Sequence, residues 1–219
     1  MDSLQNIIFD FDGTLADTSR LIVATMQKSI QDYELPYRNE DQIKATIGVR
    51  LEEIPSILWD KIRIPGEGFA NIYRKNFELL KDKIPVTLFP GVRETLSDLK
   101  DNGYLMAIAT SRSRRSLEEL TDQLAIKDFF VYMLGGDNVS EGKPAPESIF
   151  KIMDAFTWRA DHTLMVGDMP VDMIMGKNAG MKTCGVTYGN GKESDLKNAG
   201  ANYIITNFPA LKNILSQSY

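Results

Sequence analysis

The sequence predicts an α/β fold: a doubly wound, Rossmann-like parallel sheet that carries an inserted helical cap. Three observations support this prediction. Short apolar runs of the kind found in buried parallel strands alternate with segments of helical spacing. This alternation stops after the first run and resumes only near residue 86. Acidic pairs follow two of the runs, where the carboxyl ends of parallel strands meet at one edge of a sheet.

The predicted strands are short, apolar and bounded by polar or turn residues, as expected for strands that are covered on both faces. They span residues 6–11, 104–110, 129–134, 163–168, 182–187 and 202–206.

Helical patterns fill the intervals between these strands. The segment 92–103 ends at Gly103, a residue suited to a helix C-terminus. The next helical segment begins at Ser113, a good N-cap, and a third begins with Pro146 in a first-turn position. Strands that alternate with helices in this way predict a parallel, doubly wound sheet.

The helical cap is predicted over residues 15–85, which contain several helical patterns and no convincing strand. Residues 1–14 and 86–219 then form the α/β core. Because the insertion leaves the core just after the first strand, we expect it to cover the carboxyl edge of the sheet. The apolar faces expected on two of its helices are Leu21, Ile22, Thr25, Ile30 and Tyr33, and Phe69, Ile72, Tyr73, Phe77 and Leu80.

Composition narrows the function classes. A net charge of −5 gives no general attraction to nucleic acid, and no apolar window is long enough to cross a membrane. Cys184 is the only cysteine, so no intramolecular disulfide can form, and a cytoplasmic location is the default expectation. With His162 as the only histidine, a histidine base or a multi-histidine metal site is not expected. The sequence indicates no oligomeric state.

The strongest chemical signal is Asp10-Phe11-Asp12-Gly13-Thr14, at the end of the first strand. Side chains two residues apart project to the same side of a strand, so both carboxylates should face one site. Carboxylates that approach each other repel, and a hard cation such as Mg²⁺ relieves that repulsion.

Three weaker signals follow other strands. Asp168 and Asp172 lie in a GDxxxD string, which also fits a turn before a helix with an N-terminal acid. Thr110 and Ser111 could hold phosphate oxygens or cap a helix. Lys143, in EGKPAPE, would by itself be a solvated surface lysine. Together with Asp10 and Asp12, however, they form a chemically complete set: nucleophile, acid/base, metal carrier, oxyanion donors and balancing cation.

The chain resembles the haloacid dehalogenase-like hydrolases in the order and context of four motifs. These are DFDGT at 10–14, TS at 110–111, Lys143 in GKPAPE and GDMPVD at 167–172. The resemblance covers essentially the whole chain. The insertion after the first motif and the tail GKNAGMKTCGVTYG at 176–189 look most like the phosphoglycolate phosphatase-like branch, which also includes inorganic pyrophosphatases and β-phosphoglucomutases. One departure is that Ser111 and Arg112 stand where many members of this branch carry Asn and Lys.

The resemblance implies a Mg²⁺-dependent phosphatase that acts on a small phosphorylated metabolite through an aspartyl-phosphate. Asp10 would be the nucleophile and a metal ligand. Asp12 would be the acid and would bind the metal through its backbone carbonyl. The remaining implied roles are phosphoryl binding by Thr110 and Ser111, charge screening by Lys143, metal ligation by Asp168 and support of the metal site by Asp172.

Several alternatives remain at this point. A pyrophosphatase or a β-phosphoglucomutase-like phosphotransferase would share all four motifs. A dehalogenase would need neither Asp12 nor a metal site, and a phospho-receiver module would lack the helical insertion. Within the cap, Arg50, Lys61 and Arg63 could recognise an anionic tail of the substrate, although each is individually more typical of a surface charge.

Overall fold

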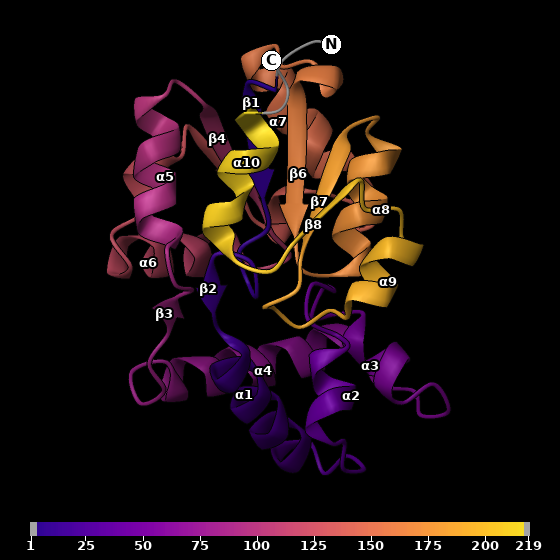
Figure 1. Ribbon diagram of the computed structural model, residues 1–219. Helices are drawn as coiled ribbons and strands as arrows, with labels where there is room; N and C mark the ends of the chain where they lie inside the picture. Colours follow the sequence, from indigo (N-terminus) through magenta and orange to yellow (C-terminus); the bar gives the residue numbers. More distant parts are fainter. Residues whose placement is uncertain (1–3, 217–219) are drawn as a thin grey trace.

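The computed structural model describes residues 4–216, which form a parallel sheet with helices on both faces and a separate helical layer at one end (Figure 1). All pairings in the six-stranded sheet are parallel, and the strand order is β5-β4-β1-β6-β7-β8. The predicted fold class is confirmed. The strands are β1 (Asn6–Phe9), β4 (Leu105–Ala109), β5 (Tyr132–Leu134), β6 (Thr163–Gly167), β7 (Lys182–Val186) and β8 (Tyr203–Ile205).

Alternate residues of β1 face two different cores. Ile7 and Phe9 belong to the apolar cluster beneath α5, α6 and α10, whereas Ile8 belongs to the cluster beneath α7 and α8. All three side chains are completely buried, which explains the uninterrupted apolar run of this strand. The core helices are α5 (Val92–Asp101), α6 (Arg114–Gln123), α7 (Glu147–Phe156), α8 (Pro170–Asn178), α9 (Glu193–Asn198) and α10 (Leu211–Ser216).

Two of the predicted helix ends are found as expected, and one differs by a residue. Ser113 caps α6, its Oγ accepting the backbone N–H of Ser116 at 3.4 Å. Gly103 follows α5 with a φ of 82°, in the left-handed region that favours glycine. Pro146 is the N-cap of α7 rather than its first-turn residue.

The helical layer consists of α1 (Ser19–Asp32), α2 (Glu40–Lys44), α3 (Ile54–Leu58) and α4 (Gly66–Leu80). α1 packs along α4, and the predicted apolar faces supply the contact, with Leu21, Phe69 and Phe77 buried. The expectation that residues 15–85 contain no strand is wrong. Ala16–Asp17 (β2) pairs antiparallel with Thr87–Leu88 (β3), so the two chain connections to the helical layer run side by side. A strand of two residues is too short to show an alternating pattern.

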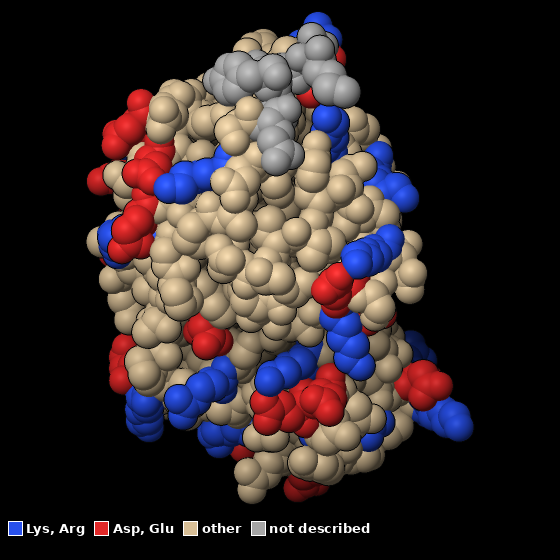
Figure 2. All heavy atoms as spheres, in the orientation of Figure 1, with Lys and Arg blue, Asp and Glu red and all other residues tan. Residues whose placement is uncertain are grey.

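On the face drawn in Figure 2, blue and red side chains lie close together over the helical layer. Ion pairs within single helices of the layer bring opposite charges together, such as Lys28 with Asp32 and Lys44 with Glu40. This face of the layer therefore carries no patch of a single sign. Among residues 4–216, no helix is both long enough and apolar enough to cross a membrane.

Candidate active site

The sheet reverses its direction of growth at β1, which has β4 on one side and β6 on the other. In open α/β sheets, ligands bind outside the carboxyl ends of the strands at such a switch point. Asp10 directly follows β1, Thr110 directly follows β4 and Asp168 directly follows β6, so the three predicted motifs converge here. The single histidine, His162, precedes β6 and lies at the opposite edge of the sheet.

Asp10 is buried and fixed by its backbone, whose N–H donates to the carbonyl of Val166 on β6 at 2.9 Å. Burial raises the pKa of the Asp10 carboxyl well above its ordinary value. The ammonium of Lys143 opposes that shift, and the carboxylates of Asp172 and Asp168 add to it. The ionised form of Asp10 therefore depends on nearby positive charge.

Lys143 supplies part of that charge from a buried position. Its Nζ lies 2.5 Å from a carboxylate oxygen of Asp10 and 2.8 Å from one of Asp172. Although burial disfavours the ammonium, the two carboxylates raise the pKa of Lys143, so it stays charged at neutral pH. The surface-charge interpretation of this lysine is therefore wrong, because its side chain is only 3% exposed.

Asp168 is held by Asn190, which sequence reasoning did not single out. One carboxylate oxygen of Asp168 accepts the backbone N–H of Asn190 at 2.7 Å and its side-chain amide at 2.9 Å. Burial, followed by repulsion from Asp172, raises the pKa of Asp168 to about 7. Gly13 leaves room for this arrangement, because a Cβ at that position would lie 2.1 Å from Asp168. Its φ of 85° also favours glycine.

These side chains fit a divalent metal. Asp10, Asp168 and Asp172 each offer a carboxylate oxygen, these oxygens lie within 4.8 Å of one another, and all three residues are buried. Three carboxylates with one ammonium leave an excess of negative charge in a desolvated space. Hard oxygen ligands in such a cluster suit Mg²⁺. Asp172 already accepts from Lys143 with one oxygen and from the backbone N–H of Met169 with the other.

The two small hydroxyl residues after β4 have different contacts. Thr110 is buried, and its Oγ1 accepts the backbone N–H of Arg112 at 3.2 Å, which shapes the turn. The Oγ of Ser111 donates to the carbonyl of Gly48 at 2.6 Å, so this hydroxyl joins the core to the helical layer. Their phosphoryl-binding roles stay predictions.

Arg112 is the main residue at this edge whose contacts the sequence did not predict. Its guanidinium clamps the Asp12 carboxylate with two hydrogen bonds, of 3.1 and 2.5 Å, and its third nitrogen donates to Ser116. The guanidinium also lies 5.1 Å from the ring centre of Phe77, on α4 of the helical layer. A possible signal was the departure from the family pattern at position 112, but the sequence does not indicate its partner.

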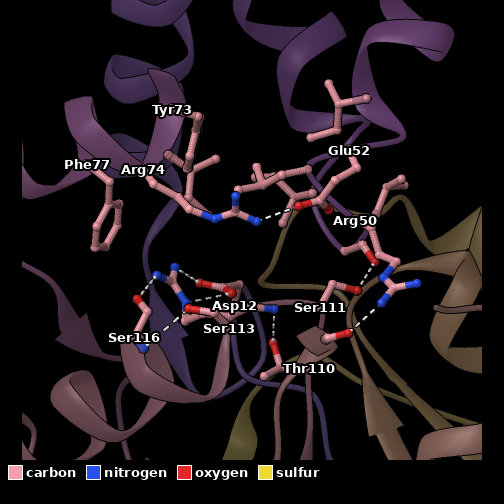
Figure 3. A pocket seen from close by; sticks show the side chains of 18 of the residues that line it. Asp12, Arg50, Glu52, Tyr73, Arg74, Phe77, Thr110, Ser111, Ser113 and Ser116 are labelled. Carbon is pink, nitrogen blue, oxygen red and sulfur yellow. Dashed lines mark hydrogen bonds and ion pairs between the residues drawn. The ribbon is translucent and has the colours of Figure 1, made fainter. Parts of the chain in front are cut away.

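A cavity of about 700 Å³ lies between the sheet edge and the helical layer (Figure 3). Asp10, Asp12 and the turn at 110–113 line its core side. The residues 46–54 and one face of α4 line its other side. The helical layer therefore covers the carboxyl edge, the position expected for an insertion that leaves the sheet after residue 14.

Arg50 crosses from the helical layer to the core. Its guanidinium donates to the carbonyls of Gly136, Val139 and Ser140, at 2.7, 2.8 and 2.7 Å. These carbonyls belong to the loop that leads to Lys143. Arg50 is thus engaged by the protein itself, and the exposed Lys61 and Arg63 do not line the cavity. The suggestion that these three cations recognise an anionic tail does not fit their places in the structure.

We expect Arg50→Met to lower the free energy of unfolding by about 1–3 kcal/mol, because the methionine keeps the aliphatic contacts but loses hydrogen bonds from a charged donor. For a chain of this size, the change corresponds to a fall in Tm of roughly 2–10 °C. Arg63→Met is the matched control, since Arg63 is an exposed arginine of the same layer. Equal effects of the two substitutions in thermal denaturation would contradict a bridging role for Arg50.

Comparison with known proteins agrees with this geometry. The chain is 35% identical over 207 residues to the "Probable phosphatase IndB" of Dickeya dadantii, covering 92% of this chain and 89% of the relative. It is 30% identical to a "Phosphoglycolate phosphatase" of Vibrio parahaemolyticus (97% and 96% covered). It is 32% identical to the "Pyrophosphatase PpaX" of Halalkalibacterium halodurans (97% of each covered).

A solved structure supports the same relationship. The crystal structure of a "Putative haloacid dehalogenase-like hydrolase" from Bacteroides fragilis superimposes with a TM-score of 0.90 at 30% identity, covering 95% of this chain and 99% of the other. The family model for haloacid dehalogenase-like hydrolases matches residues 7–186. This span contains all four motifs whose side chains meet at the switch point. The chain therefore belongs to the haloacid dehalogenase-like hydrolases, in the branch that includes the phosphoglycolate phosphatases.

Proposed function

We propose that the protein is a Mg²⁺-dependent phosphatase that hydrolyses a small phosphorylated metabolite through an aspartyl-phosphate on Asp10. The observation that carries the proposal is the buried contact of Asp10 with Lys143, beside Asp168 and Asp172, at the switch point of the sheet. Relatives across nearly the full length are named phosphatases and pyrophosphatases, which supports phosphoryl chemistry.

In the first half-reaction, a carboxylate oxygen of Asp10 attacks the phosphorus, and the bond from phosphorus to the leaving oxygen breaks. Asp12 gives its proton to that oxygen. In the second half-reaction, Asp12 takes a proton from water, which attacks the phosphorus and frees Asp10 and inorganic phosphate.

Lys143 offsets the charge that accumulates beside Asp10, and Thr110 and Ser111 bind the phosphoryl oxygens. Arg112 restrains Asp12, so Asp12 has to release one of its two hydrogen bonds before it can carry the proton.

Asp10 and Asp168 would hold Mg²⁺ through carboxylate oxygens, and Asp12 through its backbone carbonyl. Both oxygens of Asp172 already accept hydrogen bonds, which supports an orienting role for this residue. When bound, the ion would neutralise part of the negative charge shared by Asp10 and the phosphate.

We also propose that residues 15–85 act as a cap domain on a core of residues 1–14 and 86–219. The cap would exclude water during attack by Asp10 and open for product release.

A pyrophosphatase is the second candidate function, favoured by the 32% identity to a protein of that name. The single buried Cys184 is consistent with a reducing compartment, and we place the enzyme in the cytoplasm.

The test is phosphate release from a panel of phosphate monoesters and pyrophosphate. We expect turnover in Mg²⁺, a loss of at least about tenfold with a chelator, and better recovery with Mg²⁺ than with Ca²⁺, whose looser coordination would misplace Asp10. Full turnover in chelator would contradict the metal-dependent mechanism. A lack of release from every compound would contradict phosphatase activity.

Thermal denaturation gives a readout of metal binding that does not need turnover. At about 100 times its dissociation constant, Mg²⁺ should stabilise the fold by about 2.7 kcal/mol, and Tm should rise by roughly 5–10 °C. Asp168→Asn should remove most of this rise, whereas Asp41→Asn, an exposed acid at the start of α2, should keep it. An unchanged response in Asp168→Asn would remove Asp168 from the metal site.

A further inference from the structure

Beyond the phosphoryl end, the cavity is built for one class of leaving group. We infer that the alcohol released by this enzyme is uncharged and carries an apolar ring, in contrast to the carboxylate of phosphoglycolate or the second phosphate of pyrophosphate. This inference rests on the proposed function, which it makes more specific. It is carried by the size of the cavity, the apolar character of its wall and the pairing of the cations that line it.

The cavity is larger than a minimal phosphate ester requires. At about 700 Å³, it falls in the middle of the ~300–1,000 Å³ range of pockets that enclose drug-sized molecules. Asp10 and Asp12 lie on its core side, so a phosphoryl group placed there leaves most of the volume to the leaving group. The substrate therefore has a body of substantial size.

The wall opposite Asp10 and Asp12 is largely apolar. Ile22 and Met26 of α1 and Ile54 of α3 line it, together with Tyr73 and Phe77 of α4. The rings of Tyr73 and Phe77 are nearly parallel, with centres 6.5 Å apart, and both side chains are labelled beside the cavity in Figure 3. Aromatic side chains at a pocket wall favour contact with a flat or apolar ring of the ligand.

The cations that line the cavity are engaged within the protein. Arg112 is paired with Asp12, Arg74 with Glu52, and Arg115 with Glu119, while Arg50 is bound to backbone carbonyls. In Figure 3, Arg74 and Glu52 point toward each other on the cap side. Lys75 is the remaining lining cation among the described residues, and it is exposed to solvent at the rim.

With Asp10 and Asp12 included, seven acids and five cations line the cavity. The acids beyond Asp10, Asp12 and the partners of the arginines are Glu53, Asp137 and Glu78, which pairs with Lys81. A carboxylate or phosphate on the leaving group would give up its hydration in a cavity where every lining cation except Lys75, at the rim, is already engaged, and the excess of acids would repel it. An uncharged ring loses little hydration on entry and buries apolar surface against Tyr73 and Phe77.

Two matched pairs of esters test this inference. Phenyl phosphate and 4-carboxyphenyl phosphate differ by one carboxylate, and benzyl phosphate and phosphoglycolate are both esters of primary alcohols. In each pair, we expect kcat/KM for the ester with the uncharged leaving group to be at least about tenfold higher than kcat/KM for the ester whose leaving group carries a carboxylate. Equal values, or a preference for the charged member, would overturn the inference while leaving phosphatase activity in place. A lack of phosphate release from all four would overturn the inference, and the wider panel of monoesters and pyrophosphate would then decide the proposed function separately.

Leu51 provides a complementary test, because it lines the cavity and is only partly buried, so it tolerates replacement better than the buried wall residues. Leu51→Arg adds a cation to the lining, and Leu51→Gln is the neutral polar control. We expect the arginine variant to lower the ratio of kcat/KM for phenyl phosphate to kcat/KM for 4-carboxyphenyl phosphate by at least about fivefold. The glutamine variant should leave this ratio within about twofold of the wild-type value. Equal shifts in both variants would show that charge does not decide the selection.

Discussion

Asp10→Asn is expected to abolish phosphate release while leaving the fold intact. An amide of the same shape is a poor nucleophile, so kcat should fall by a factor on the order of 10⁴ or more, as when other covalent nucleophiles are removed. The structure also indicates why the fold should survive. Because burial and nearby acids raise the pKa of Asp10 well above its ordinary value, the ionised carboxylate costs folding free energy at neutral pH. The neutral amide avoids that cost, and Lys143 keeps Asp172 as a partner.

The measurement is single-turnover and steady-state phosphate release, with Tm recorded for each variant. Asp17→Asn is the control, since Asp17 is an exposed acid on β2 that follows the same motif. A kcat within tenfold of the wild type for Asp10→Asn would exclude a covalent intermediate on this residue. A large fall in Tm would instead mean that the lost activity reports unfolding.

The placement of the acidic motifs could be predicted because it depends on local patterns. Apolar runs such as 6–11 and 163–168 indicate strands, and parallel strands all end at one edge of a sheet. Asp10 and Asp168 therefore had to lie near each other once the fold class was predicted. The apolar stripe with Phe69 and Phe77 likewise follows from helical periodicity.

Contacts that depend on tertiary geometry could not be predicted in the same way. Arg112 pairs with Asp12 across 100 residues, and Arg50 reaches the carbonyl of Gly136 across 86 residues. An arginine on a turn has the same local pattern whether it faces solvent, a substrate or a carboxylate. The two-residue strands β2 and β3 were missed because they form only where the ends of the insertion meet.

Arg112 and Arg50 together connect the proposed cap to catalysis. Arg112 contacts both Asp12 and the ring of Phe77 on α4, so movement of the cap would change the surroundings of the clamped acid. Arg50 contacts the loop that leads to Lys143, so the same movement would alter the support of the cation beside Asp10. Closure of the cap and assembly of the charged site are therefore expected to occur together.

Lys143→Ala is expected to separate catalysis from metal binding. Loss of the ammonium should lower kcat/KM roughly 10²–10³-fold. This corresponds to about 3–4 kcal/mol of lost transition-state stabilisation, comparable to the loss of one preorganised donor. The same change leaves Asp10 and Asp172 without their shared cation, so the metal-free protein should be less stable, by up to about 3–5 kcal/mol. Because the acidic cluster becomes more negative, Mg²⁺ should bind more tightly than to the wild type, and it should restore much of the lost Tm.

The matched control is Lys151→Ala, which removes an exposed lysine of α7 that pairs with Glu147. It should change neither kcat/KM nor the Mg²⁺ affinity beyond about twofold, in keeping with the small contribution of exposed ion pairs. Tight metal binding combined with poor turnover in Lys143→Ala would be the signature of a cation that acts on the reacting phosphate. If Lys143→Ala behaved like Lys151→Ala in both measurements, the charge-screening role would be wrong. If Mg²⁺ affinity fell together with kcat/KM, Lys143 would instead serve to keep the carboxylate cluster assembled.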